Sequence, residues 1–264
     1  MALEHHLNHR ARYDQQVENS ANYVLPFIEQ SVPVSAGKNI LEVGTGEGGV
    51  LKPFIERGAN CVGVDLNPDR IELANDFLKD EVAAGKVEFL LQNIYEEGFT
   101  KRFTGFFDVV ILKDVIEHVP EQEQFIKHLK TLIRPGGIIF FGFPPWYMPF
   151  GGHQQVCRTK WASKIPYYHI LPTFLYKGLL KMAGEHDNII RELLEIKDTQ
   201  ITIERFERIV RRSGLQVKQK RHYLISPIYK YKFGLQPRVQ LAPITWIPYF
   251  RDFVTTCVYY NVGA

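Results

Sequence analysis

A glycine-rich turn directly after a short apolar run constrains the fold of this chain more than any other feature. The run Asn39-Ile40-Leu41 is typical of a β-strand, and it leads into Glu42-Val43-Gly44-Thr45-Gly46-Glu47-Gly48-Gly49. Glycine has no Cβ atom, so such a turn lets the backbone approach a ligand closely. The glycines at 44, 46 and 49 also fit the G-x-G-x-x-G spacing of dinucleotide-binding proteins, which is a weak signal alone. The turn predicts a nucleotide-type ligand at the end of a first strand.

Glu42 narrows the chemistry of that ligand. A carboxylate near the carboxyl end of a strand is costly to bury unless it has a partner. A cationic amino group on the ligand would be such a partner. S-adenosylmethionine carries this group, whereas a nicotinamide dinucleotide does not need the acid.

Four further strands are predicted in the first half of the chain, at residues 61–65, 87–91, 106–112 and 138–143. Helices are predicted between them at 49–57, 69–83 and 121–132. Alternating strands and helices favour right-handed crossovers and a largely parallel, doubly wound α/β sheet. Asp65 ends the second strand, where a carboxylate would meet a ribose diol.

Four motifs lie in order between residues 38 and 143: LEVGTGEGG, VGVDLNP, FDVVILKDVIEHV and IRPGG. On these motifs the chain resembles the class I S-adenosylmethionine-dependent methyltransferases of the small-molecule type. The resemblance implies a Rossmann-like seven-stranded sheet, mostly parallel with an antiparallel last strand. It implies S-adenosylmethionine as cofactor and a small-molecule or amphiphilic acceptor, with oxygen as the expected methylated atom.

The same resemblance implies which residues hold the cofactor. They are Glu42, Gly44, Thr45, Gly46, Gly48, Asp65, Leu66, Asn93, Ile94, Lys113, Asp114 and His118. Gln92-Asn93 stands where the family often has aspartate, but an amide oxygen can still accept a hydrogen bond from an adenine amino group. Glu117, Glu121 and Glu123 lie near His118 at a spacing that matches no strong metal motif, so we expect no metal site.

Regular alternation stops after the fifth strand. Residues 144–200 contain no obvious strand, and a helix is predicted only at 173–183. A connection this long usually serves a function. It leaves the carboxyl end of a strand, which is the ligand side of an open α/β sheet. We therefore expect residues 144–200 to form a cap over the acceptor.

Two histidines are candidates for the base that takes a proton from a hydroxyl or phenol acceptor. His153 follows Gly151-Gly152 in the loop after strand five, and His118 follows strand four; imidazole titrates near physiological pH. A merely hydrogen-bonded loop histidine is the alternative for His153. The residues expected to contact the acceptor are Trp146, Tyr147, His153 and Trp161, although these aromatics could equally form a small core of the cap itself.

We expect one domain over residues 1–264. Its parts are an N-terminal helical segment (1–36), a Rossmann-like core (37–143 and 201–264) and the cap (144–200). A helix at 10–30 would cover the cofactor or simply pack on the sheet. A helix at 202–212 and strands at 215–223 and 253–260 complete the core, with these two strands antiparallel at one sheet edge.

Composition limits the cellular compartments that fit this protein. Three scattered cysteines without metal-ligand spacing fit a reducing compartment. The polar N-terminal stretch is unlike a secretory signal, and no run approaches the length of a membrane span. These features predict a cytoplasmic protein. His5, His6 and His9 look like a ligand cluster, but they lie at a polar terminus.

Charge is distributed unevenly along the chain. Residues 201–264 hold 11 Lys or Arg against three Asp or Glu. A solvated basic face is the simplest interpretation, and an anionic substrate or membrane surface is the alternative. Tyr229-Lys230-Tyr231-Lys232-Phe233 and Trp246-Ile247-Pro248-Tyr249-Phe250-Arg251 mix rings and cations, as a peripheral membrane contact would.

Three other functions compete with methyl transfer to a small molecule. The glycine spacing alone would allow an NAD-dependent oxidoreductase, but no dehydrogenase catalytic set is recognisable. A nucleic-acid methyltransferase would resemble its relatives in an (Asn/Asp)-Pro-Pro-aromatic motif after strand four; here Phe143-Pro144-Pro145-Trp146 follows strand five. We therefore expect no nucleic-acid partner. A protein that binds the cofactor without turnover is the third.

Overall fold

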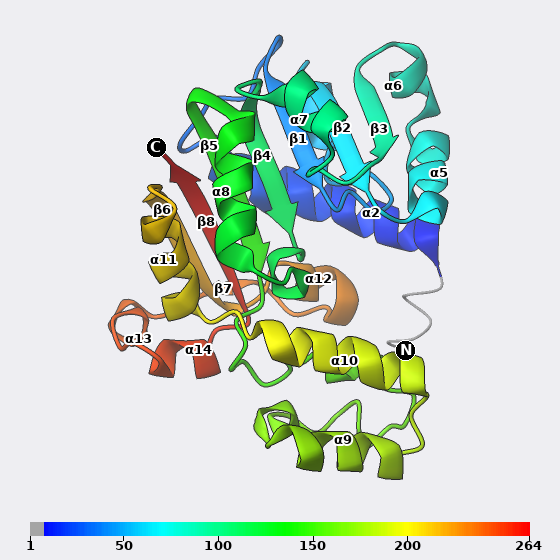
Figure 1. Ribbon diagram of the computed structural model, residues 1–264, viewed down its shortest axis with the longest axis vertical. Helices are drawn as coiled ribbons and strands as arrows, with labels where there is room; N and C mark the ends of the chain where they lie inside the picture. The colour runs from blue at the N-terminus through cyan, green and yellow to red at the C-terminus, as the bar shows by residue number, and fades with distance from the viewer. Residues whose placement is uncertain (1–7) are drawn as a thin grey trace.

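The computed structural model describes residues 8–264 and contains one twisted sheet with helices on both faces (Figure 1). The strands are β1 (Asn39–Val43), β2 (Asn60–Asp65), β3 (Val87–Leu91), β4 (Phe107–Lys113), β5 (Ile133–Phe143), β6 (Gln216–Ile225), β7 (Arg238–Val239) and β8 (Cys257–Gly263). Their order across the sheet is β3-β2-β1-β4-β5-β8-β6-β7. The pairs among β1 to β5 are parallel, and β8, β6 and β7 add three antiparallel pairs.

The predicted fold class is confirmed, but the described residues form eight strands rather than seven. The additional strand, β7, has two residues and pairs with β6 at the sheet edge. So short a strand cannot show the alternation of apolar and polar residues by which strands are found in a sequence. Consequently β6 and β8 pair antiparallel as predicted, but β7 takes the edge position.

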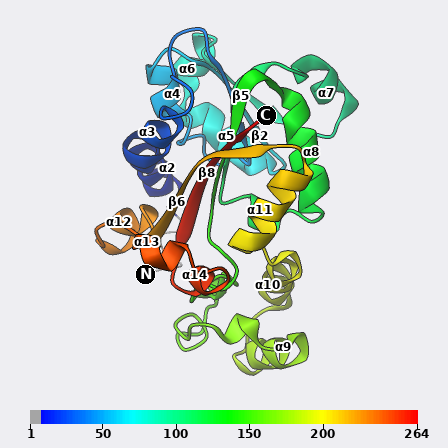
Figure 2. The same cartoon turned by 90° about the vertical axis from the view of Figure 1, so that its left-hand side faces the viewer.

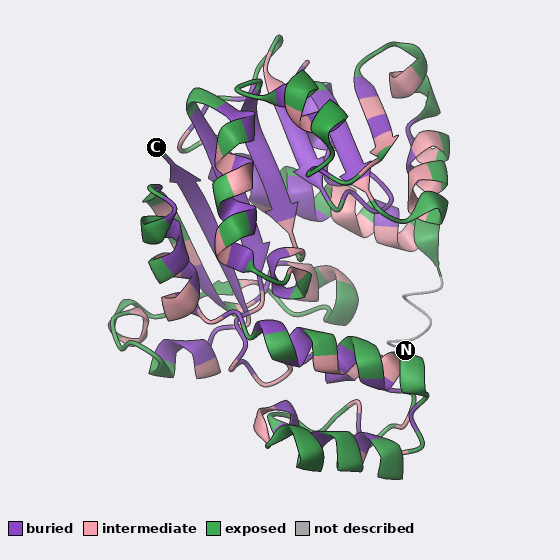
Figure 3. Ribbon diagram, viewed as in Figure 1, coloured by how far each residue is buried: buried purple, intermediate pink, exposed green. Residues whose placement is uncertain are grey.

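Each face of the sheet has its own apolar core. One face packs against α7 (Glu97–Phe103), α8 (Gln122–Leu132) and α11 (Ile203–Arg212). The other packs against α2 (His9–Asn19), α3 (Leu25–Ile28), α4 (Lys52–Glu56) and α5 (Pro68–Phe77). Figure 2 shows the two layers on either side of the sheet, and Figure 3 shows that the central strands are almost wholly buried. Burial on both faces explains why β4 and β5 read as continuous apolar runs.

The predicted N-terminal helix forms as α2, a π-helical turn (Ser20–Val24) and α3. The predicted helix at 69–83 is divided at Leu78 into α5 and α6 (Lys79–Ala83). Asn67 caps α5, because its side-chain oxygen accepts hydrogen bonds from the amide groups of Asp69 and Arg70. The start of α5 is thereby fixed immediately after β2.

Residues 144–200 lie beyond the carboxyl ends of the parallel strands (Figure 1). They contain two single 3₁₀ turns, η3 (Gln154–Val156) and η4 (Tyr168–Ile170), and the helices α9 (Thr173–Met182) and α10 (Asp187–Thr199). The predicted helix at 173–183 is α9. The sequence analysis missed α10, although Ile190, Leu193 and Ile196 are buried along one of its faces.

The segment has a small core of its own. The buried members of this core are Cys157, Ala162, Tyr168, Tyr176, Leu180, Ile190 and Leu193. After α11 and β6 come α12 (Ile228–Phe233), β7, α13 (Ala242–Thr245) and α14 (Phe250–Phe253). The last strand begins at Cys257 rather than at 253, because residues 250–253 form α14.

Candidate active site

The glycine turn after β1 is shaped for a close approach of backbone to ligand. Gly44 and Gly46 have φ angles of +70° and +54°, which side chains rarely allow. A Cβ atom on Gly44 would also lie 2.7 Å from Cγ2 of Val115, in the segment after β4. The turn therefore needs glycine both for its backbone angles and for its contact with the neighbouring strand end.

Glu42 is buried at the end of β1, with 2% of its surface exposed. The hydroxyl of Thr45 donates a hydrogen bond to its carboxylate at 2.9 Å. Burial raises the pKa of Glu42 to about 8, against the opposing effects of Thr45 and the nearby Lys113 ammonium. A cation at this position would stabilise the ionised carboxylate, so the group suits a ligand that carries an ammonium group.

Asp65, at the end of β2, stabilises the glycine turn by hydrogen bonding. Its Oδ2 accepts a hydrogen bond from the amide of Gly46 at 2.9 Å, and its Oδ1 accepts one from the amide of Asn67 at 3.0 Å. Each carboxylate oxygen has a further lone pair, so Asp65 can still accept a hydrogen bond from a diol. Leu66 follows it and is 70% exposed.

The predicted residues after β3 are only partly available to a ligand. The side-chain oxygen of Asn93 accepts a hydrogen bond from the amide of Tyr95 at 3.0 Å. The Ile94 side chain is buried in the core, and its carbonyl oxygen accepts a hydrogen bond from the ring of His128 at 2.8 Å. The second lone pair of the Asn93 oxygen and the backbone amide of Ile94 remain for an adenine ring.

The helix α2 is tied to the glycine turn through Glu47, which the sequence analysis did not single out. The Glu47 side chain is fully enclosed and contacts His9, Arg12 and Arg70 at 3.1 to 3.5 Å. Gln16 also accepts a hydrogen bond from the amide of Gly49 at 3.3 Å. The sequence did hold a signal for Glu47: it is an acid inside a glycine turn, and a carboxylate buried there requires cationic partners.

Lys113 and Asp114 form an ion pair at the end of β4, with 2.5 Å between Nζ and Oδ2. Enclosure would raise the pKa of Asp114, but Lys113 and, more weakly, Lys232 lower it. Lys232 belongs to α12, which lies in one of the stretches predicted to contact a membrane. It nevertheless lies near Asp114, and it was not predicted as a site residue. Asp114 has a φ angle of +56°, an unusual backbone conformation at the start of the segment that carries His118.

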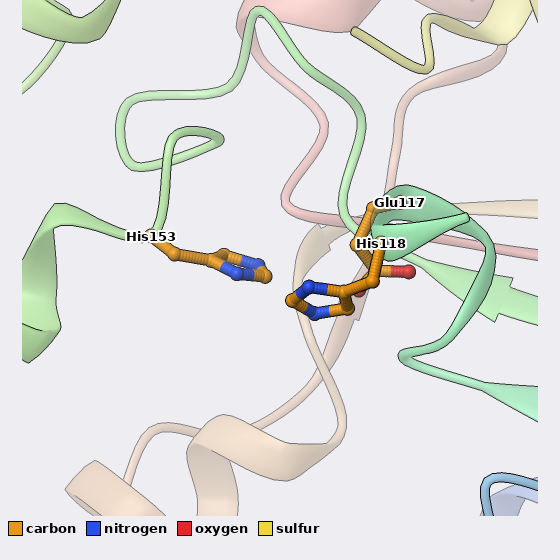
Figure 4. Close-up of side chains that lie close together, drawn as sticks. All are labelled: Glu117, His118 and His153. Carbon is orange, nitrogen blue, oxygen red and sulfur yellow. The ribbon is translucent and has the colours of Figure 1, made fainter. Parts of the chain in front are cut away.

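The two histidines predicted to act on the acceptor come together. His118 ends the 3₁₀ turn η2 (Ile116–His118), and His153 directly precedes η3. Their ring centroids are 5.2 Å apart, and the carboxylate of Glu117 lies beside them (Figure 4). Burial and the neighbouring His118 lower the pKa of His153 to about 3, so its imidazole is neutral at physiological pH.

His169 holds the loop that presents His153. Its Nε2 bonds with the carbonyl of Trp146 at 2.9 Å and its Nδ1 with the Gln154 amide nitrogen at 3.1 Å. A Cβ atom on Gly152 would lie 2.4 Å from Cβ of His169, so only glycine fits there. The loop is therefore packed tightly, and His153 keeps a φ angle of +56° within it.

The predicted acceptor-contacting aromatics do not form one group. Trp146 is buried and meets the edge of His169, which favours the alternative that it packs within the cap. Tyr147 stacks on Phe253 of α14, and Trp161 is 40% exposed. His5 and His6 lie outside the described residues. A groove of about 490 Å³ lies between α8 and α11 and is lined by acids and arginines, and its lining residue Gln122 donates a hydrogen bond to the carbonyl of Ile116.

Comparisons with known proteins identify the family. A family model described as a methyltransferase domain matches residues 13–170. The ubiquinone biosynthesis O-methyltransferase of Ralstonia nicotianae is 36% identical over 118 residues, covering 44% of this chain and 47% of that protein. The enzyme of the same name from Erwinia tasmaniensis is 28% identical over 139 residues, covering 51% and 56%. The chain thus spans about half the length of these curated relatives.

Among solved structures, the phosphoethanolamine N-methyltransferase 2 of Haemonchus contortus in complex with S-adenosyl-L-methionine has the same fold. The TM-score is 0.55 at 14% identity, and the match covers 92% of this chain and 52% of that one. Across residues 8–264, no helix combines the length and apolar character that a membrane crossing requires.

Proposed function

Since this chain belongs to the class I S-adenosylmethionine-dependent methyltransferases, we propose that it transfers a methyl group from S-adenosylmethionine to an oxygen atom of a small or amphiphilic acceptor. The observation that carries the proposal is the meeting of His118 and His153 beyond the carboxyl end of the sheet, in a segment whose Val115 contacts Gly44 of the glycine turn. An O-methyltransferase needs groups that hold and activate a hydroxyl there. The O-methyltransferases among its relatives support oxygen as the acceptor atom.

The residues at the strand ends fit the cofactor. The glycine turn gives a cradle that a Cβ atom would fill, and Glu42 offers a buried carboxylate to the ammonium group of the methionine part. Asp65 would accept hydrogen bonds from the ribose hydroxyls, and the adenine would lie by Leu66, Asn93 and Ile94. When bound, the cofactor supplies an activated methyl group on sulfur.

The role of the protein is to align the acceptor with that methyl group. Holding donor and acceptor in line accounts for much of the acceleration in such a displacement. In this proposal, residues 144–200 cover the acceptor and His153, on their first loop, faces it together with His118. Thr199 donates a hydrogen bond from its hydroxyl to the carbonyl of Glu117 at 2.5 Å, so the far end of the cap is tied to the segment that carries His118.

Family membership leaves the dehydrogenase alternative without support. The nucleic-acid alternative is likewise not favoured, because the named relatives act in ubiquinone biosynthesis. A cofactor-binding protein without turnover is distinguished from an enzyme only by observing the product.

The proposal is tested by incubating the protein with methyl-labelled S-adenosylmethionine and a panel of phenols, catechols, carboxylic acids and amines. We expect label in a phenol or catechol and a loss of about 100-fold in turnover in His153→Ala, because the acceptor would lose a group that holds its oxygen in line with the methyl group. His186→Ala, an exposed histidine of the same segment, is the matched control. Label only in amines would contradict oxygen as the acceptor atom.

A further inference from the structure

We propose that Glu117, His118 and His153 form a binding site for a borderline divalent transition metal such as Zn²⁺ or Co²⁺. Their potential ligand atoms, one from each side chain, all lie within 4.8 Å of one another. Two ligands come from the segment after β4 and the third from the first loop of the cap, 35 residues later in the chain. Sequence spacing could not reveal such a set, and for this reason the sequence analysis expected no metal.

Glu117 is the independent observation that points to a cation. Its side chain is 2% exposed, yet neither carboxylate oxygen has a hydrogen-bond partner among residues 8–264. Buried polar atoms in native proteins are nearly always satisfied, so each exception calls for an explanation. A metal ion between Glu117 and the two imidazoles would satisfy the carboxylate.

The two imidazoles are also available. Within the described part of the chain, no side-chain hydrogen bond engages a ring nitrogen of His118 or His153. His169, 16 residues after His153, has both ring nitrogens bonded and serves the loop instead. The strained backbone of His153 thus presents a ring with no structural partner, as expected where strain serves a function.

The distances are within reach of coordination. Two ligand atoms that each lie about 2.1 Å from one Zn²⁺ can be no more than about 4.2 Å apart. Small rotations of the imidazole rings would therefore bring all three atoms to a common ion. Of the neighbouring cations, Lys113 is neutralised by Asp114 in the ion pair beside Glu117, and Lys232 is a second one near Asp114 and His153.

The donor set indicates which metal. Two nitrogens and one carboxylate suit Zn²⁺, Co²⁺ or Fe²⁺, whereas Mg²⁺ prefers oxygen ligands throughout. Three protein ligands also leave at least one coordination position open, as in catalytic rather than structural metal sites. If the proposed function holds, an acceptor hydroxyl would take that position, where the ion would lower its pKa so that its proton passes to solvent. His118 and His153 would then orient the acceptor through the ion instead of accepting its proton.

The test is a titration of the full chain with Co²⁺, followed by its visible absorption, and with Zn²⁺ by calorimetry after treatment with a chelator. All proteins compared carry His5→Ala and His6→Ala, so that the N-terminal histidines do not bind the metal. We expect one ion per chain. His153→Ala and Glu117→Gln should each weaken binding at least about tenfold, the lower limit found even for partners outside the coordination shell.

Glu117→Gln is the sharper of the two variants, since glutamine has the shape of a neutral carboxyl group. If the carboxyl group of Glu117 had only a structural role, this variant would bind the metal nearly as well as the parent protein. Glu121→Gln and His186→Ala are the matched controls and should bind the metal like the parent protein. Equal Co²⁺ binding in the parent, Glu117→Gln and His153→Ala proteins would overturn the site, as would a preference for Mg²⁺ over Zn²⁺.

Binding of S-adenosylhomocysteine is measured on the same samples. Retained cofactor binding with lost metal binding shows that a variant is folded and locates the loss at the metal site. The metal titration does not depend on methyl transfer. A protein that binds the ion but methylates no acceptor would contradict the proposed function alone, and one that methylates at full rate after complete metal removal would contradict the role of the ion toward the acceptor.

Discussion

Asp65 combines a structural task with a predicted binding task. One oxygen of its carboxylate accepts a hydrogen bond from the amide of Gly46, and the other accepts one from the amide of Asn67. The side chain therefore sets the shape of the glycine turn before any ligand binds. The last residue of β2 can therefore present a rigid acceptor to a ribose. Preorganisation of this kind reduces the entropy lost on binding.

We expect Asp65→Ala to weaken binding of S-adenosylhomocysteine by about 1.5–3 kcal/mol, the range for hydrogen bonds to a charged group. Asp65→Asn keeps one oxygen and should lose less. Calorimetry at constant pH measures both, with Asp69→Ala in the first turn of α5 as the control. An unchanged affinity in a folded Asp65→Ala protein would show that the ribose lies elsewhere.

Residues within one motif were predictable because strand, turn and acid follow each other along the chain. Glu42 lies one residue before the end of β1 and Asp65 ends β2, so both acids stand near strand ends as expected. Contacts between distant segments were not predictable in this way. Glu47 meets Arg12 and Arg70 only because α2 folds back over the turn, and His153 meets Glu117 only because the cap loop returns to β4.

At the scale of elements, α2 is joined to the glycine turn through Glu47. Burial alone would raise the pKa of Glu47, but Arg12, the His9 hydrogen bond and Arg70 together lower it from its ordinary value of 4.5. A carboxyl group whose pKa is lower in the folded protein stabilises the fold above its unfolded pKa. That contribution is lost as the pH falls through the folded pKa.

Glu47→Gln should therefore destabilise α2 most at neutral pH, and the difference from the parent protein should shrink below about pH 4.5. Hydrogen exchange of residues 9–19 at pH 7 and thermal midpoints between pH 7 and 3 measure the two effects. Glu97→Gln removes an exposed ion pair with Lys101 and is the control. A constant difference between parent and variant over this pH range would contradict the assignment to the ionised carboxylate.

Periodicity accounts for only part of what was predicted among the elements. The apolar face of α11, with Phe206, Ile209 and Val210 buried, was recognised from its spacing. By contrast α10 was not predicted, although Ile190, Leu193 and Ile196 recur along one of its faces. The two-residue strand β7 is defined by its pairing with β6, so tertiary contacts decide it and local pattern does not.

At the scale of the whole molecule, the cap region has an unusual surface. Residues 144–184 contain five Lys or Arg and no Asp or Glu. Large apolar side chains are exposed on the same segment, among them Phe174 at 74% and Met182 at 76%. Tyr167 donates a hydrogen bond to the carbonyl of Phe253 at 3.1 Å, so this surface adjoins α14.

The predicted membrane contact through the C-terminal third stays a prediction. Arg251 is buried and paired with Glu204 and Glu207, so it is not a free surface cation, whereas Lys230 and Lys232 are exposed. Trp246 is 76% exposed and Tyr249 63%, beside α13 and α14. Figures 1 and 2 place α9, α13 and α14 toward the same end of the molecule. Residues 144–184 therefore add cations to those of the predicted contact.

We expect this combined surface of α9, α13 and α14 to bind anionic membranes, because exposed rings enter the headgroup region while lysines meet lipid phosphates. Each cation contributes on the order of 1 kcal/mol, and salt screens it. Co-sedimentation with phosphatidylglycerol vesicles should be strong at low salt and weak at high salt or with phosphatidylcholine alone. Phe174→Ser with Trp246→Ser should reduce it, whereas Leu91→Ser, an exposed leucine on β3, should not. Equal sedimentation with both lipids, or none at low salt, would contradict binding to anionic membranes. A water-soluble acceptor would then be the better hypothesis.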